Sequence, residues 1–288
     1  MTDPYHPIDL RRAAVDQYGP GAEVVLEGDH LYSWAASVGG DRRVLDLARA
    51  VRTQYGPTHQ LATTGVHAFD WAAVELEAAA PAVLPVMLVS SDHLFDIDGV
   101  RDGLARFESV LATVAAWYEV HVGARYRMLQ PLVVRTDRDA ASWARISRDT
   151  TEEGLRYELL AEAIDAYRSE LGDPPDQLRV VISIHTGDGS DDWYGAAARP
   201  PFAVAPPRAT SVWCPASGVP GPECANAAYA IGHELGHTFG LGHPCEDGLA
   251  PDPECRGSIM ETTEPPGATL LEPEVAHLLG TGFFDRDG

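Results

Sequence analysis

The stretch from residue 233 to 243 constrains this chain more than any other, because it places three histidines and a glutamate at fixed intervals. It reads H-E-L-G-H-T-F-G-L-G-H. Residues i and i+4 of an α-helix project from one face about 6 Å apart along the axis, so His233 and His237 can share one metal ion. Glu234 lies on the adjacent flank, where it can reach a water molecule on the open side of the metal. The pattern predicts a helix that carries a metal site.

The third histidine needs a change in chain direction. A helix that continued would carry His243 away from the metal, whereas glycine at position 240 can adopt the left-handed conformation that ends a helix. Gly242 eases the same turn, and His243 returns as the third ligand. We therefore expect one Zn²⁺ per chain, held by three imidazoles with the fourth position open. A purely structural zinc is less favoured, because such sites fill all four positions with Cys and His.

The spacing H-E-x-x-H-x-x-G-x-x-H resembles the motif of the metzincin clan of zinc endopeptidases, which also has a methionine-containing turn after the third histidine. Ser258-Ile259-Met260 fits that turn. The resemblance implies that Met260 packs beneath the metal and its ligands without binding the metal. It is specific over residues 226 to 262, only architectural over 81 to 225, and absent from residues 1 to 80. Astacins and serralysins carry a tyrosine two residues after this methionine, where this chain has Thr262, so no subfamily is assigned.

This resemblance implies a zinc metalloendopeptidase that acts on peptide or protein substrates. Glu234 would be the catalytic residue, taking a proton from water and passing it to the leaving nitrogen. Two alternatives stay open: a specialised amide hydrolase that acts on one peptide intermediate, and a zinc-bearing module that binds peptides without cutting them. The sequence does not identify the substrate, because the binding pockets are built by loops whose conformation cannot be predicted from the sequence.

The composition excludes some classes of partner. The chain has 288 residues, 45% of them hydrophobic, which is enough for a substantial core. A formal net charge of −22 opposes binding to nucleic acid or to an anionic membrane surface. No segment has 18 uninterrupted apolar residues, so we expect no membrane span. The oligomeric state does not follow from these data.

The four cysteines all lie in the last third of the chain and flank the metal-binding helix. They allow three pairings. We expect the local one, Cys214 with Cys224 and Cys245 with Cys255, which closes two short loops beside the cleft. A second zinc on these cysteines is less favoured, because no C-x-x-C spacing is present. Disulfides favour an oxidising location, whereas the N-terminus lacks the features of a secretory signal and by default indicates the cytoplasm, so the compartment stays open.

The expected fold class is α/β (α+β), with a catalytic domain over residues 81 to 288. Its upper subdomain, 81 to 243, should contain a twisted, mostly parallel mixed sheet with helices. The expected strands are 83–90, 127–135 and 178–185, and the expected helices are 100–120 and 151–171. The metzincin resemblance adds an edge strand along the cleft, at 202–205 or 210–213. The lower subdomain, 244 to 288, should be irregular apart from the methionine turn and a final helix over about 273–279.

Two local details of this region are also predicted. Asn226 is a plausible N-cap for the metal-binding helix, whose buried stripe should consist of Ala228, Ile231, Leu235 and Thr238. Asp188, Asp191 and Asp192 form an acidic loop with oxygen ligands for calcium. Their spacing is not that of an EF-hand, so a solvated turn is favoured over a calcium site.

Residues 1 to 80 predict a mostly helical N-terminal region. Helices are expected over 9–18, 41–55 and 68–80, with a short strand over 22–26. The region is interpreted as a prosegment, a substrate-recruiting module or a structural addition. If the region is an inhibitory prosegment, Asp29 is the residue expected to face the zinc.

Overall fold

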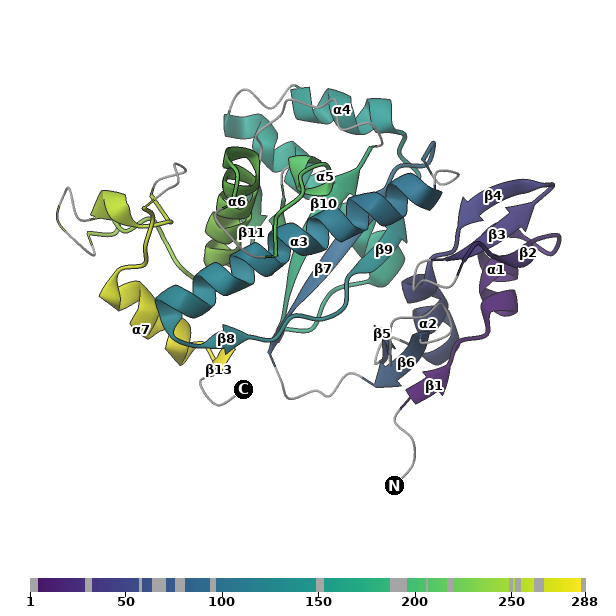
Figure 1. Ribbon diagram of the computed structural model, residues 1–288, viewed down its shortest axis with the longest axis horizontal. Helices are drawn as coiled ribbons and strands as arrows, with labels where there is room; N and C mark the ends of the chain where they lie inside the picture. The colour runs from purple at the N-terminus through teal and green to yellow at the C-terminus, as the bar shows by residue number, and fades with distance from the viewer. Residues whose placement is uncertain are drawn as a thin grey trace.

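The computed structural model describes residues 5–28, 33–56, 59–63, 71–75, 81–93, 97–148, 153–186, 196–205, 207–216, 220–248, 251, 255–261 and 267–285. These residues form a mixed α/β fold in which helices cover both faces of a central sheet, as Figure 1 shows. The expected fold class is therefore confirmed.

The central sheet has five strands in the order β11-β12-β10-β7-β9. They are β7 (Ala82–Val89), β9 (Leu132–Arg135), β10 (Leu178–His185), β11 (Ala197–Arg199) and β12 (Phe202–Val204). All neighbours are parallel except β11, which pairs antiparallel with β12 at one edge. Every residue of β7 is buried, which is typical of a parallel strand covered on both faces.

The two faces of the sheet pack against different helices, because alternate residues of a strand point to opposite sides. Leu84 and Val86 pack in one layer with α5 (Glu153–Leu171). Val83 and Val181 pack in the other with α3 (Ile97–Val122) and α6 (Pro222–Thr238). The sequence did not predict the short helix α4 (Ala140–Arg148).

Helix α6 carries the histidine motif, and its core-facing side agrees with the prediction. The four residues of the predicted stripe, Ala228, Ile231, Leu235 and Thr238, are all buried. The prediction of Asn226 as the N-cap is wrong, because the helix begins one turn earlier, at Pro222, with Gly221 as its N-cap. Proline suits the first helical position, where its missing N–H has no helical partner.

The predicted edge strand needs a correction. Residues 202–204 do form a strand, but β11 lies outside it, so β12 is an internal strand. Residues 207–210 form the 3₁₀ helix η2 (Pro207–Thr210), and Ser211 to Trp213 are not in a strand. Similarly, only Leu132–Arg135 of the predicted strand 127–135 belongs to the central sheet.

The described residues after His243 are largely irregular, as expected. It contains the 3₁₀ helix η3 (Cys255–Gly257), the final helix α7 (Glu272–Gly280) and the short strand β13 (Phe284–Asp285), which pairs with β8 (Arg125–Tyr126). Leu278 of α7 is fully buried against the layer that contains α3 and α6.

The prediction of a mostly helical N-terminal region is wrong. Its described residues form two three-stranded sheets, of orders β1-β6-β5 and β2-β3-β4, and two helices. The elements are β1 (Tyr5–Pro7), α1 (Leu10–Tyr18), β2 (Glu23–Leu26), β3 (Trp34–Val38), β4 (Asp41–Val44), α2 (Leu47–Tyr55), β5 (His59–Thr63) and β6 (Trp71–Glu75). The helix at 9–18 and the strand at 22–26 are confirmed. The helix predicted over 41–55 is correct only from Leu47 onward, and Trp71–Glu75 is a strand where a helix was predicted.

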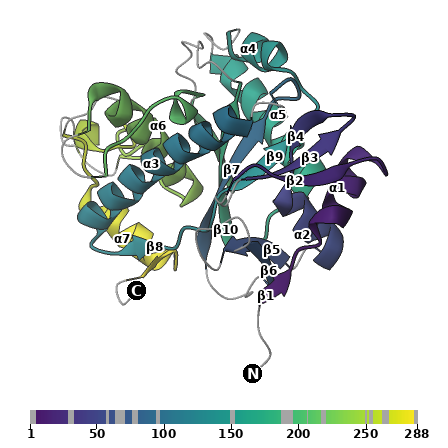
Figure 2. The ribbon, with the colours of Figure 1, turned by 45° about the vertical axis from the view of Figure 1, so that its right-hand side comes forward.

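The N-terminal region shares its core with the rest of the chain. Leu47, Val51 and Leu61 belong to the same buried cluster as Leu84 and Leu132 of the central sheet. Figures 1 and 2 place this region at the opposite end of the molecule from α6. Asp29, proposed as a zinc-facing group, lies outside the described residues. Among the described helices, none combines the length and apolarity that a membrane span requires.

Candidate metal centre

The structure brings together the three histidines of the motif. The Nε2 atom of His237 lies 3.1 Å from Nε2 of His233 and 3.2 Å from Nε2 of His243. One nitrogen from each ring lies within 4.8 Å of the other two. Two rings come from successive turns of α6 and the third from the segment that follows the helix.

The hydrogen bonds of the other ring nitrogens define what faces the centre. Nδ1 of His233 lies 2.7 Å from the carbonyl oxygen of Ile259, and Nδ1 of His237 lies 2.9 Å from that of Leu241. A carbonyl only accepts, so each Nδ1 carries the proton and each Nε2 directs a lone pair toward the centre. Lone pairs at 3.1 Å repel one another unless a cation lies between them. Nitrogens on a tetrahedral zinc, with bonds of about 2.0–2.1 Å, lie about 3.3 Å apart, so the arrangement fits zinc.

Burial keeps these rings neutral. It lowers the pKa of His233 to about 4, against a smaller opposing effect of the hydrogen bond to Ile259. Burial is also the main cause that lowers the pKa of His237. Both imidazoles are therefore unprotonated near pH 7, which is the form that binds a metal.

Gly240 ends the helix in the predicted way. Its φ is +94°, a conformation that other residues rarely adopt. A Cβ at this position would also lie 3.0 Å from Nε2 of His277. The N–H of Leu241 donates to the carbonyl of Gly236 and closes the turn that leads to His243. At Gly242, a Cβ would lie 2.0 Å from a carboxylate oxygen of the exposed Asp247, so a larger residue here would displace that side chain.

Met260 is fully buried and packs directly against α6. A Cβ at Gly236 would lie 2.5 Å from its sulfur and 3.1 Å from the hydroxyl of Tyr118, which itself donates to the carbonyl of Gly232 at 2.7 Å. The sequence analysis did not use this pair of glycines. The signal was present, because two glycines inside one helix, four residues apart, cost about 1 kcal/mol each and need a packing reason.

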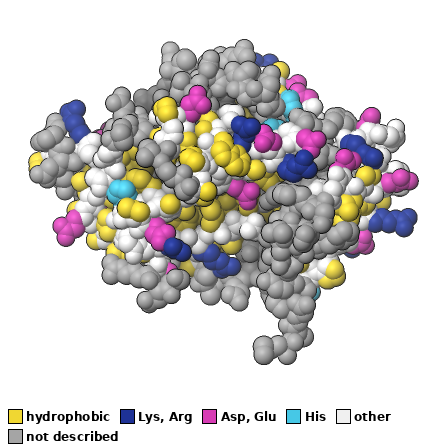
Figure 3. Space-filling view, viewed as in Figure 1, with side chains coloured by type: hydrophobic (Ala, Val, Ile, Leu, Met, Phe, Trp, Pro, Cys, Tyr) yellow, Lys and Arg dark blue, Asp and Glu magenta, His cyan; other side chains and the backbone are white. Residues whose placement is uncertain are grey.

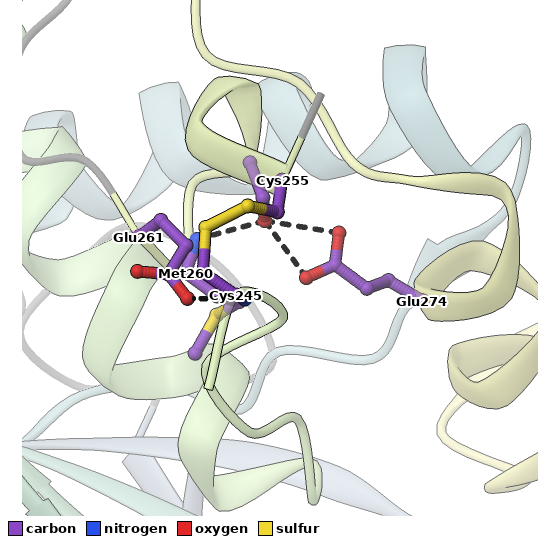
Figure 4. Close-up of a disulfide and its surroundings, with 6 residues drawn as sticks. Cys245, Cys255, Met260, Glu261 and Glu274 are labelled. Atoms are coloured by element: carbon purple, nitrogen blue, oxygen red, sulfur yellow. Dashed lines mark hydrogen bonds between the residues drawn. A yellow bond between two sulfur atoms is a disulfide. The ribbon is translucent and has the colours of Figure 1, made fainter. Parts of the chain in front are cut away.

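The turn that contains Met260 is held by a buried hydrogen-bond network, drawn in Figure 4. The Ser258 hydroxyl lies 2.7 and 3.0 Å from the carboxylate oxygens of Glu274 on α7, and it accepts a hydrogen bond from the N–H of Met260 at 3.0 Å. The same carboxylate accepts a hydrogen bond from the N–H of Leu271 at 2.6 Å. Burial raises the pKa of Glu274. This network fixes the turn to the final helix.

A second link joins the turn to the loop of the third histidine. Glu261, next to Met260, accepts a hydrogen bond from the N–H of Cys245 at 2.6 Å, and Cys245 forms a disulfide with Cys255, as Figure 4 shows. Cys245 is two residues from His243. The loop is therefore held by one covalent bond and one charged hydrogen bond. Sequence reasoning found neither Glu261 nor Glu274.

The expected cysteine pairing is confirmed. Cys214 pairs with Cys224 in the first turn of α6, and Cys245 pairs with Cys255, which leaves no thiol for a second zinc site. The two bonds hold the start of α6 and the segment that follows its last histidine. Disulfides of this kind are typical of oxidising environments.

A cavity of about 240 Å³ lies between α3 and α6. Trp117, Ala228, Tyr229, Gly232 and Ile259 contribute to its walls, so it extends to the residue before His233. Figure 3 shows hydrophobic side chains gathered in the middle of the face on which α3 lies. The cavity places apolar surface beside the histidine cluster.

Other predicted site residues are less defined. Glu234 follows His233 on α6, and its side chain is half-buried. Thr262, at the position where astacins and serralysins carry a tyrosine, lies outside the described residues. The acidic loop with Asp188, Asp191 and Asp192 also lies outside the described residues. The structure therefore does not test the choice between a solvated turn, which the sequence favours, and a calcium site.

Comparisons with known proteins give distant matches. No family model matches this sequence, and no curated protein matches it significantly. A catalytically inactive OgpA from Akkermansia muciniphila, solved with an O-glycopeptide substrate, glycodrosocin, is similar at a TM-score of 0.44 and 14% identity, over 72% of this chain and 62% of OgpA. The chain thus spans less than two thirds of that protein. A zinc-dependent peptidase from Methanocorpusculum labreanum is similar at a TM-score of 0.31 and 14% identity, over 67% of this chain and 99% of that one. At this distance, the functional argument depends on the site itself.

Proposed function

We propose that this protein is a zinc-dependent endopeptidase of metzincin type. The observation that carries the proposal is the convergence of lone pairs: two Nδ1–H groups are committed to carbonyl oxygens, and the Nε2 atoms of His233, His237 and His243 approach one another at 3.1 and 3.2 Å. A helix-ending glycine and a buried methionine against the same helix support the metzincin interpretation.

The chemistry then divides between the metal and the chain. Zinc at this position supplies Lewis-acid polarisation of a substrate carbonyl and acidification of water. Glu234 removes a proton from the attacking water with its carboxylate and delivers it to the leaving nitrogen. The carbonyls of Ile259 and Leu241 hold the rings of His233 and His237 in orientation. The apolar cavity beside Gly232 receives a hydrophobic substrate side chain.

Two other functions remain to be separated from this one. A peptide-binding module needs the three histidines but has no use for a carboxylate next to the first of them. An amide hydrolase with one peptide intermediate as substrate has the same centre but a narrow substrate range. Glu234 therefore tests the first alternative, and a diverse peptide library tests the second.

The experiment compares Glu234→Gln with the wild type. We expect the variant to keep its fold and one zinc per chain while peptide cleavage falls about 10²- to 10⁴-fold, the usual contribution of a general base. Glu223→Gln is the matched control, because Glu223 is an exposed glutamate in the first turn of the same helix. Absence of zinc from the purified wild type would refute the proposal. A wild type that cuts nothing in the library but binds peptides as well as Glu234→Gln would support the binding module.

A further inference from the structure

A second cavity, of about 270 Å³, lies between the N-terminal region and α5. Five leucines line it, one each from β5, β7, β9, β10 and α5, and all belong to the core layer on the opposite face of the central sheet from α6. The sheet therefore separates it from the histidine cluster. Four polar side chains also line it, those of Arg52, His59, Tyr167 and Asp173.

Arg52 lies in the last turn of α2 and is half-buried. Its guanidinium rests against Gly172, where a Cβ would lie 2.9 Å from Nη2, and burial lowers its pKa. Among the described residues, none accepts a hydrogen bond from this guanidinium or forms an ion pair with it. Arg49, one turn earlier on the same helix, pairs with Glu170 of α5 at 2.8 Å. Arg52 is therefore a partly desolvated cation that has no hydrogen-bond acceptor among the described residues.

Tyr167 provides a second donor at the same cavity. The residue is only 2% exposed, and its hydroxyl makes no hydrogen bond with the described residues. This hydroxyl is not fully enclosed by protein, because a fully buried hydroxyl without a partner would be counted among the buried unsatisfied atoms. Since Tyr167 lines the cavity, its hydroxyl lies at the cavity surface. Burial raises the pKa of Tyr167 to about 12, with an opposing effect of Arg52. The group is therefore a protonated donor close to the guanidinium.

We propose that this cavity binds a small organic carboxylate with an apolar tail. The carboxylate accepts hydrogen bonds from Arg52 and Tyr167, and the tail lies against the leucines. Arginine matches a carboxylate well, because its planar group can donate two parallel hydrogen bonds. The volume equals that of about nine water molecules at ~30 Å³ each, which suits a short acyl or aryl chain.

The charges around the cavity favour a monoanion over phosphate. Asp173 also lines the cavity and forms an ion pair with Arg168 at 2.7 Å, so a second negative charge on the ligand would be repelled. The net charge of −22 repels anions in general, so binding depends on the local cation. Because the cavity walls come from both the N-terminal region and the central sheet, the bound acid also joins these two parts of the fold.

The test titrates octanoate into the full-length protein by calorimetry, with 1-octanol as the uncharged ligand of equal chain length and inorganic phosphate as the anion without a tail. We expect one octanoate per chain and at least about tenfold weaker binding of the other two, because charged hydrogen bonds and apolar burial both contribute. Arg52→Gln should weaken octanoate binding at least about tenfold, and Tyr167→Phe should weaken it less. Arg49→Gln is the matched control and should bind octanoate like the wild type.

Several results overturn the proposal. The first is that octanoate does not bind at concentrations below about 10 mM. The second is that octanol or phosphate binds as tightly as octanoate. The third is that Arg52→Gln binds octanoate as tightly as the wild type. If Arg52→Gln does not fold, Tyr167→Phe decides, because it removes one donor and no charge. Undiminished octanoate affinity in that variant then counts against the site.

Discussion

Gly236 of α6 lies against both Tyr118 of α3 and Met260. We expect Gly236→Ala to destabilise the protein by about 1–3 kcal/mol, because the added methyl group would meet the Met260 sulfur and the Tyr118 hydroxyl in a packed core. This loss should exceed the gain of about 1 kcal/mol in helix propensity. Urea unfolding measures the change.

Gly232→Ala is the matched control for this substitution. There the nearest atom to an added Cβ is the terminal Cδ1 of Ile259 at 3.0 Å, the flexible end of a side chain that can move. The control should therefore lose less stability than Gly236→Ala. A Gly236→Ala protein as stable as the wild type would contradict the close packing of Met260.

The histidines make separate predictions about the metal. His237→Ala should lower the zinc content from the expected one per chain to nearly none. A chelator should lower the melting temperature of the wild type but not that of the variant. His277→Ala is the control, because its ring contacts the carbonyl of Phe239 outside the histidine cluster. Elemental analysis of both variants measures the difference. Full zinc retention by His237→Ala would remove this residue from the site.

At the level of single residues, the sequence predicts what depends on local geometry. The i, i+4 histidines and the turn at Gly240 follow from helix periodicity and glycine conformation. The residues that support them do not, because their partners are distant in sequence. Tyr118 is 114 residues from Gly232, whose carbonyl it contacts, and Glu261 is 16 residues from Cys245. No periodic pattern connects such pairs.

Among the secondary-structure elements, α2 shows how tertiary pairing changes a local prediction. Helical apolar spacing runs through residues 41–55, but Asp41–Val44 pairs with β3 and the helix begins after Asp46. The Asp46 side chain accepts the Arg49 N–H at 2.8 Å, an N-cap that the prediction overlooked. Strand β6 is similar: its alanine-rich sequence favours a helix, yet both of its edges are paired, with β1 and β5.

The same N-cap makes stability depend on pH. Asp46 is 1% exposed, and burial raises its pKa from 3.8 to about 7. The native state therefore binds a proton that the unfolded state releases, so this contribution to stability is complete below about pH 4 and is lost as the pH rises toward 7. We expect the free energy of unfolding of the wild type to fall relative to that of Asp46→Asn over this range, by an amount on the order of a few kcal/mol.

Urea unfolding of both proteins at several pH values from about 4 to 8 tests this expectation. Asparagine keeps an oxygen that can cap α2 but does not titrate, so its curve should lack the Asp46 contribution. Parallel curves for the two proteins would show that the carboxyl titrates normally.

At the scale of the whole molecule, the central sheet separates two sites with different chemistry. The histidine cluster and the apolar cavity beside it belong to the layer of α3 and α6, whereas the cavity with Arg52 belongs to the layer of α5 and the N-terminal region. The order of strands and helices from residue 81 predicted a mostly parallel sheet with helices, but not which face of the sheet each helix covers. It did not predict the contribution of residues 1 to 80, because their small sheets are formed by pairings that no local pattern reveals.

The contribution of residues 1 to 80 to the core favours a structural role for this region over an inhibitory prosegment. The described N-terminal residues supply Leu47, Val51 and Leu61 to the core of the central sheet and lie at the opposite end from α6. Removal of residues 1 to 80 would expose apolar surface, and each exposed leucine costs about 1.5–3 kcal/mol. We therefore expect a chain of residues 81 to 288 to lose cooperative thermal unfolding and peptidase activity. Adding residues 1 to 80 as a separate fragment should restore part of both, whereas a prosegment would lower activity. A folded, more active truncated chain that the fragment inhibits would establish the prosegment.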